Sequence, residues 1–273
     1  MKSGLTAAAA LVLAIAATTA SAGVVISQEL VNQTGASKTD QTVMIQGHKQ
    51  KVIAGDKEII TDLDARKMYI LKPSIKQAVQ VPFPPTGLLA RSMIQGGSSA
   101  EFKKTGATHK VAGYACQDYK GYAPVAYTEV NVTECVASDA PGAREFVEFQ
   151  KAMADKLKGT PLAPKGEIPD GIPVSSTTAV TLTLRGVPRG MAPEQAAKLK
   201  ATLEKRKPVI SNATITKIEV KDLPADTFVV PADYQMQAAR PRTHPVTPGS
   251  APAAGAPAAP AAPAAPAAAP APH

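Results

Sequence analysis

Apolar and polar residues alternate at every second position along several short segments, and this pattern restricts the fold of the chain more than any other feature. In segment 180–185 valine or leucine alternates with threonine or arginine, and segment 24–30 has nearly the same pattern. Successive side chains of an extended strand point to opposite faces of a sheet, so a period of two indicates one buried and one hydrated face. The chain is therefore predicted to form a sheet of half-buried strands.

Other segments also have the composition of strands and are bounded by residues typical of turns. They are 43–45, a hairpin over 58–71, a pair over 111–120 and 127–136, then 214–221 and 227–230. The strands come in runs and do not alternate regularly with helices. This order predicts an α+β fold with an antiparallel sheet.

Two segments have helical spacing instead. Segment 141–158 places its large apolar residues on one stripe. These residues are Phe146, Phe149, Met153 and Leu157. Segment 192–205 has a thin apolar stripe opposite a basic face. Such a basic face is either a solvated surface or, with bulkier apolar residues, a surface that lies on a membrane.

The two ends of the chain differ from its middle. Residues 1–22 contain one early charge, an apolar run over 5–17 and Ala-Ser-Ala before Gly23, which is typical of a cleaved secretion signal. The alternative, a membrane anchor, needs a longer apolar run. Residues 251–272 are 14 Ala, 7 Pro and one Gly, a composition that breaks helices and builds no core. We therefore expect a signal peptide (1–22), a β-rich domain (23–236) and a disordered Ala/Pro-rich tail (237–273).

Cys116 and Cys135 are the two cysteines of the chain. In an exported protein we expect them to form a structural disulfide, with two free thiols as the alternative. The formal net charge of +8 favours contact with anionic surfaces, whereas an aromatic content of 4% without tryptophan argues against nucleic acid as a partner. After the signal, the sequence predicts no transmembrane span.

The sequence contains no recognisable catalytic motif. Its histidines are isolated and none is paired at the spacing of metal ligands; they are His48, His109, His244 and His273. Asp62 and Asp64 would share one face of a strand, but a hairpin turn explains both of them. We therefore predict no enzyme, no metal and no cofactor.

One further segment, 81–90, combines three prolines with several large apolar residues. Proline cannot donate to a sheet ladder, so a central strand is excluded here. The segment is either a loop packed over the core or a mobile lid over an apolar cavity.

Four stretches of the sequence, taken in order, resemble a known family. They are Ile59–Asp64 with Lys67–Tyr69, Lys110–Tyr119, Gly171–Val174 and Phe228–Tyr234. Together they resemble an uncharacterised exported bacterial family, domain of unknown function 4412, a relative of the LolA/LolB-like superfamily. The resemblance extends over about residues 23–234. The insertion of segment 192–205 and the prolines of segment 81–90 are departures from the superfamily.

The resemblance implies a half-open antiparallel β-barrel, LolA-like, with helices across its concave face. In better-understood relatives, the apolar cavity of that half-barrel holds acyl chains. This family has no assigned activity, so the resemblance carries no functional residue over to this chain.

Two interpretations of function follow. The first is a non-enzymatic exported binding module, in the periplasm, for a lipid, a lipidated protein or another amphipathic partner. Basic residues at the rim would meet an anionic headgroup. The second is a structural or interaction protein of the cell envelope, with a filled core and a spacer tail; a secreted location is the other alternative. Candidate ligand-binding residues for the first are Met68, Ile70, Leu88, Leu89, Met93, Phe146, Phe149 and Met153. Each of them is equally suited to a plain hydrophobic core.

Overall fold

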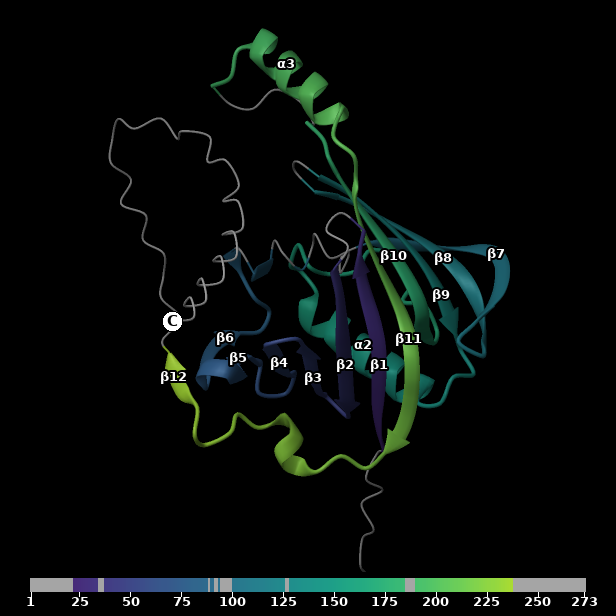
Figure 1. Ribbon diagram of the computed structural model, residues 1–273, viewed down its shortest axis with the longest axis vertical. Coiled ribbons are helices and arrows are strands. Elements are labelled where there is room, and N and C mark those ends of the chain that lie inside the picture. The colour runs from purple at the N-terminus through teal and green to yellow at the C-terminus, as the bar shows by residue number, and fades with distance from the viewer. Residues whose placement is uncertain are drawn as a thin grey trace, which may run out of the picture. The chain divides into compact units, whose positions relative to one another are not determined.

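The structure is a computed structural model that describes residues 22–33, 37–87, 89–90, 93, 100–125, 128–184 and 190–237. All but one residue of the predicted signal peptide (1–22), all but one residue of the predicted tail (237–273) and the candidate residue Leu88 lie outside the described residues. The described part consists mainly of strands, with the helices α2 and α3 (Figure 1) and further helical backbone at residues 87, 89–90 and 93.

The strands are β1 (Gly23–Asn32), β2 (Ser37–Gln46), β3 (Lys49–Ala54), β4 (Lys57–Asp62), β5 (Lys67–Lys72), β6 (Gln77–Pro82), β7 (Glu101–Val111), β8 (Tyr114–Val125), β9 (Thr128–Ala137), β10 (Ile172–Leu182), β11 (Val209–Lys221) and β12 (Gln235–Gln237). They form a 12-stranded sheet in the order β12-β6-β5-β4-β3-β2-β1-β11-β10-β9-β8-β7. Neighbouring strands are antiparallel except β12, which runs parallel to β6. The predicted α+β class with an antiparallel sheet is confirmed, and the sheet is open, with β12 and β7 at its edges.

The two predicted helices are also confirmed, as α2 (Ala143–Leu157) and α3 (Pro193–Glu204). Helix α2 packs on β1, β2 and β10. Helix α3 lies in the connection between β10 and β11, at the ends of those two strands (Figure 1). Of the two, α2 is therefore the helix that crosses a face of the sheet. No helix among the described residues has the length and apolar character that crossing a membrane requires.

Strand alternation gives the sheet two apolar faces over β1–β6. Ile45 and Met68 point to the face that α2 covers and share a core with Phe149 of that helix. Ile60 and Leu71 point to the opposite face, where they pack with Phe228 from the C-terminal segment. This half of the sheet is thus buried on both sides, and the chain after β11 provides the second cover.

The predicted strand over 227–230 is wrong. The chain there forms a 3₁₀ turn, η2 (Ala225–Phe228), followed by non-repetitive backbone. Prolines stand on both sides of this short segment, at Pro224 and Pro231, and proline cannot donate to a sheet ladder. The apolar residue Phe228 is buried through contacts of its side chain on the sheet, without strand pairing.

The proline-rich segment 81–90 packs on the core, but it is not a loop throughout, because its backbone is helical at Gly87, Leu89 and Ala90. Val81 and Pro82 end strand β6, and Phe83 is 3% exposed within the main core. Leu89 and Ala90 pack against the same core. These contacts favour packing over a mobile lid.

Candidate functional site

One side of helix α2 packs in the core, and another side borders a pocket. It begins after Gly142, whose φ is 76° and whose position leaves no room for a side chain: a Cβ there would lie 2.5 Å from Cγ2 of Val24. This close approach sets the helix directly on β1. Phe149 and Leu157 are then fully buried, whereas Phe146 and Met153 are only partly buried.

The chain that follows α2 builds a wall opposite the helix. The Thr160 hydroxyl donates to the carbonyl of Leu157 at 2.7 Å, and Leu162 is 1% exposed, so the turn after the helix is anchored in the core. At its far end Gly171 has a φ of 147°, and a Cβ there would lie 2.4 Å from the carbonyl oxygen of Ala137 at the end of β9. The loop 163–171 therefore returns directly to the sheet and stands between α2 and β9.

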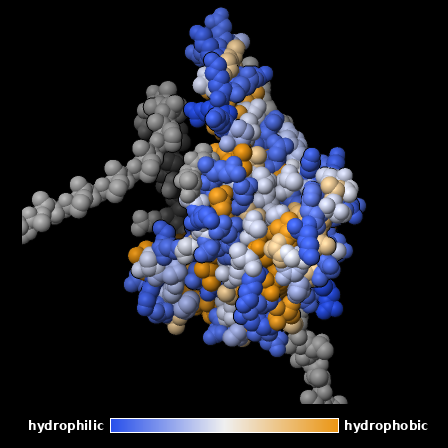
Figure 2. All heavy atoms as spheres, turned by 45° about the vertical axis from the view of Figure 1, so that its right-hand side comes forward, coloured by the Kyte–Doolittle hydropathy of each residue, from blue (hydrophilic) through white to orange (hydrophobic). Residues whose placement is uncertain are grey.

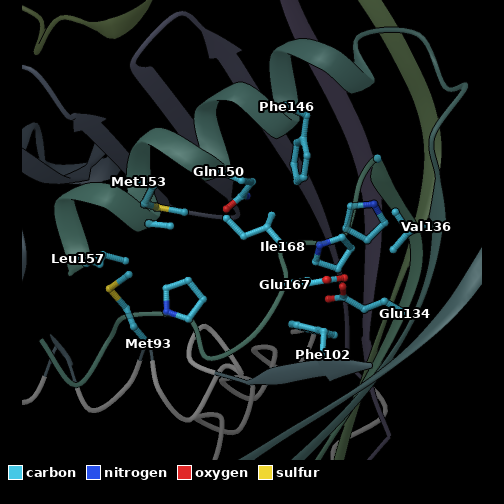
Figure 3. Close-up of a pocket in the computed structure, with 15 residues that line it drawn as sticks. Met93, Phe102, Glu134, Val136, Phe146, Gln150, Met153, Leu157, Glu167 and Ile168 are labelled. Carbon is cyan, nitrogen blue, oxygen red and sulfur yellow. The ribbon is translucent and has the colours of Figure 1, made fainter. Parts of the chain in front are cut away.

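A pocket of about 250 Å³ lies between α2, β9 and this loop (Figure 3). Its lining residues are Met93, Phe102, Glu134, Val136, Phe146, Gln150, Met153, Ala154, Leu157, Pro164, Glu167, Ile168, Pro169, Gly171 and Pro173. Phe146, Gln150 and Met153 point from α2 toward the loop that carries Ile168 and Glu167 (Figure 3). The wall of the pocket is mainly apolar. The volume of the pocket is slightly below the range of about 300–1,000 Å³ that is common for small-molecule sites. The pocket therefore suits a short apolar group.

Two carboxylates stand at one end of the pocket. Glu134 comes from β9 and Glu167 from the loop, and their carboxylate groups point toward each other (Figure 3). Within the part of the chain that the structure describes, neither carboxylate has a hydrogen-bond or ion-pair partner. The Glu134 residue is partly exposed, but its carboxyl group lies deep among protein atoms, and this burial raises its pKa from 4.5 to about 7.

The candidate residues predicted from sequence divide into three groups. Met93, Phe146 and Met153 line the pocket. Met68 and Phe149 are buried in the core and Leu89 packs against that core, so these three fill space and do not border the pocket. Ile70 is a partly buried residue of β5 that also lies away from the pocket lining, and Leu88 is outside the described residues.

Several lining residues were not predicted from sequence. Gln150 follows Phe146 by one helical turn, so the apolar stripe of α2 contained a signal for it. No comparable sequence pattern indicated that Glu134 and Ile168 would line a pocket. Glu134 occupies a strand position beside Thr133, where a charged residue ordinarily faces water. Only the return of the loop over β9 encloses it.

The predicted disulfide is confirmed between Cys116 and Cys135. Cys135 lies opposite Asp118 in the β8–β9 register, so the bridge joins diagonal neighbours on the two strands. It cross-links the strand that carries Glu134 to the adjacent strand. The back wall of the pocket is therefore covalently fixed.

Two histidines form surface pairs with carboxylates. His48 Nδ1 lies 2.8 Å from Asp64 Oδ1, and His109 Nε2 lies 2.8 Å from Asp118 Oδ2. Both imidazoles are more than half exposed, and neither borders the pocket. Asp62 accepts a hydrogen bond from the backbone NH of Ala65 at 2.8 Å, as expected for a turn. Among the described residues, no three His, Cys, Asp or Glu side chains gather at a spacing suited to a metal ion.

Helix α3 has few contacts that would bury an apolar stripe. Ala196 is its buried residue, and Leu199 is 37% exposed. The surface of this helix in the upper part of the molecule is mostly hydrophilic (Figure 2). These features favour a solvated surface over a membrane-binding surface as the interpretation of the basic face of α3.

The comparisons with known proteins do not assign the chain to a group. No family model matches the sequence, and no curated protein matches it. One solved structure that matches weakly is described as "Structure of PNGF-II in C2 space group"; the TM-score is 0.38 and the sequence identity 7%. The match covers 80% of this chain and 31% of that chain, so the protein spans less than a third of the length of that structure. A similarity at this level carries no argument about function.

Proposed function

We propose that this protein is an exported, non-enzymatic binding module of the LolA-like half-barrel type, and that it holds the apolar part of a small amphipathic guest. The leader-like composition of residues 1–22 supports export, and the sequence resemblance supports the half-barrel. The observation that carries the proposal is the pocket of about 250 Å³ beside α2, with Phe146, Met153 and Met93 in its apolar wall. Burial of apolar surface in such a space contributes about 25 cal/mol per Å².

The size of the pocket limits the guest. A space of about 250 Å³ takes a short alkyl chain or a single ring, not the several long acyl chains of a complete lipid. The guest is therefore a small amphiphile or one end of a larger lipid-bearing partner. The alternative, a structural protein of the cell envelope, draws support from the filled core around Phe149 and Met68.

Binding is tested by mass spectrometry of the gently purified protein and by titration with a fluorescent probe that brightens in apolar surroundings. Phe146→Asp places a charge in the apolar wall and is expected to abolish probe binding and to remove any co-purified guest. Ile75→Asp is the matched control, because Ile75 is 53% exposed and lies away from the pocket. Circular dichroism verifies that both variants fold.

Phe146→Ala, which keeps the wall apolar, serves as the milder variant and should weaken probe binding without loss of the fold. Wild-type protein that contains no guest and binds no probe would refute the binding module and favour the structural alternative.

A further inference from the structure

Among the described residues that border the pocket, the charged groups all have one sign. Of the described residues in its wall, the polar side chains are Glu134, Gln150 and Glu167, and none is a lysine, arginine or histidine. The two carboxylates point toward each other at one end, while the apolar side chains of α2 line the remainder (Figure 3). The pocket is thus an apolar space with an acidic end.

Basic groups in the neighbourhood do not neutralise this end. Glu134 of β9 is paired with Tyr119 of β8 on one side and with Ser176 of β10 on the other. The exposed Lys104 of β7 is paired with Tyr119, one strand further away. Lys151 of α2 and Lys165 of the loop are also exposed and do not border the pocket. None of these lysines forms an ion pair with Glu134 or Glu167. An anionic headgroup would therefore meet uncompensated like charge.

We propose that the guest has an ammonium head on a short apolar body, with the head held between Glu134 and Glu167 and the body along Phe146 and Met153. An alkylammonium donates up to three hydrogen bonds, and each carboxylate accepts them. The head would satisfy the buried carboxyl group of Glu134, while the exposed Glu167 would exchange part of its contact with water for a contact with the head. The apolar body fills the space beside α2. This inference rests on the proposed binding function, and it replaces the expected anionic headgroup with a cationic one.

The acid–base behaviour of Glu134 links binding to pH. Burial raises the pKa of its carboxyl group to about 7, so the group is mostly neutral below pH 7 and mostly ionised above it. Among the titratable groups around it, Glu167 lines the same pocket and Tyr119 is its strand neighbour. An ammonium, with a pKa near the value of about 10.4 for a lysine side chain, remains charged through this range. Binding of the ammonium therefore strengthens as Glu134 loses its proton.

The test uses the full chain and three probes with the same eight-carbon tail: octylamine, octanol and octanoate. Each displaces a bound apolar fluorophore, at pH 6 and at pH 8. We expect octylamine to bind tightest and octanoate weakest at pH 8. Because about one-eleventh of Glu134 is ionised at pH 6 and most of it at pH 8, octylamine affinity should rise about tenfold between them.

Glu134→Gln should remove this rise with pH and bring octylamine close to octanol, whereas Glu167→Gln should weaken octylamine binding at both pH values. Glu148→Gln is the control, because Glu148 is an exposed residue of α2 outside the pocket. Thermal melts verify that each variant folds.

The possible outcomes separate the two proposals. If all three probes bind equally, or octanoate binds best, the pocket is a binding site and the ammonium inference is refuted. If none binds to the wild-type protein, both the binding function and the inference fail. Tighter binding of octylamine that Glu134→Gln leaves unchanged would also overturn the inference, since the head would then lie elsewhere.

Discussion

Replacing Glu134 with glutamine should leave the stability of the folded chain unchanged below pH 4.5 and increase it progressively between pH 4.5 and 7, to a constant gain above pH 7. The carboxyl group of Glu134 has its pKa raised by burial to about 7 in the folded chain, against an ordinary value of 4.5. A raised pKa means that the folded chain holds the proton more tightly than the unfolded chain. The stability that this group contributes is fully present below pH 4.5 and is lost as the pH rises through 7.

The magnitude follows from the two pKa values. Each tenfold change in proton affinity corresponds to about 1.4 kcal/mol, so the ionised Glu134 disfavours folding at pH 8 by about 3 kcal/mol at most. Because the residue is partly exposed, water reduces this value, and we expect about 1–3 kcal/mol. Glutamine has nearly the shape of the protonated side chain and no charge at any pH. The variant should therefore gain this amount at pH 8 and less than about 0.5 kcal/mol at pH 4.5, where half of the unfolded-state carboxyl groups are ionised.

The assay is urea denaturation of wild type and Glu134→Gln at pH 4.5, 6 and 8, with the free energy of unfolding obtained by linear extrapolation. Glu148→Gln, at an exposed position of α2, controls for the loss of one negative charge and should differ from wild type by less than about 0.5 kcal/mol at every pH. A Glu134→Gln difference that stays constant from pH 4.5 to pH 8 would show that the carboxyl group is not buried as described. The reasoning about the acidic end of the pocket would then fail with it.

Two further predictions concern the frame around the pocket. Reduction of the Cys116–Cys135 disulfide, which spans a sequence separation of 19, should lower the free energy of unfolding by about 3 kcal/mol, measured in urea with and without reductant; an unchanged midpoint would contradict a structural bridge. Phe228→Ala removes an aromatic ring from the outer core over Ile60 and Leu71 and should destabilise the chain by about 3 kcal/mol. Hydrogen exchange should quicken in β4–β6 and not in β8–β9, and a uniform change over the sheet would contradict the outer cover.

Local patterns predicted the parts of the fold that depend on neighbours in sequence. The stripe of Phe146 and Phe149 lies on α2, and the hairpin over 58–71 forms β4 and β5. Of the alternating segment 180–185, only residues 180–182 belong to β10, and Leu182 is 38% exposed. Strands β3, β6, β7 and β12 were not predicted. The sequences of β3 and β7 are polar and rich in lysine, which does not favour a half-buried strand. These segments form strands because the adjacent strands offer them paired hydrogen bonds, a cause that a single segment does not contain.

The site was less predictable than the fold. The stripe on α2 indicated an apolar face, but Phe149 fills the core and Phe146 borders the pocket, although they are only three residues apart. Whether Phe146 or Phe149 borders the pocket depends on the loop that returns to the sheet at Gly171, a segment that follows the helix in sequence. The same loop encloses Glu134. Its raised pKa is therefore a property of the tertiary arrangement and has no counterpart in the strand sequence.

The position of β1 in the sheet has a consequence for the order of folding. It is the first strand of the chain, yet it lies between β2 and β11, with Gly23 opposite Lys221. A chain that leaves a channel from its N-terminus can pair β1 with β2 early, but the other edge of β1 has no partner until β11 has emerged. Closing so long a loop is slow, and an unpaired apolar edge favours association between chains in the meantime. The incomplete chain therefore needs protection during synthesis, and a chain shortened before β11 would keep that edge unpaired permanently.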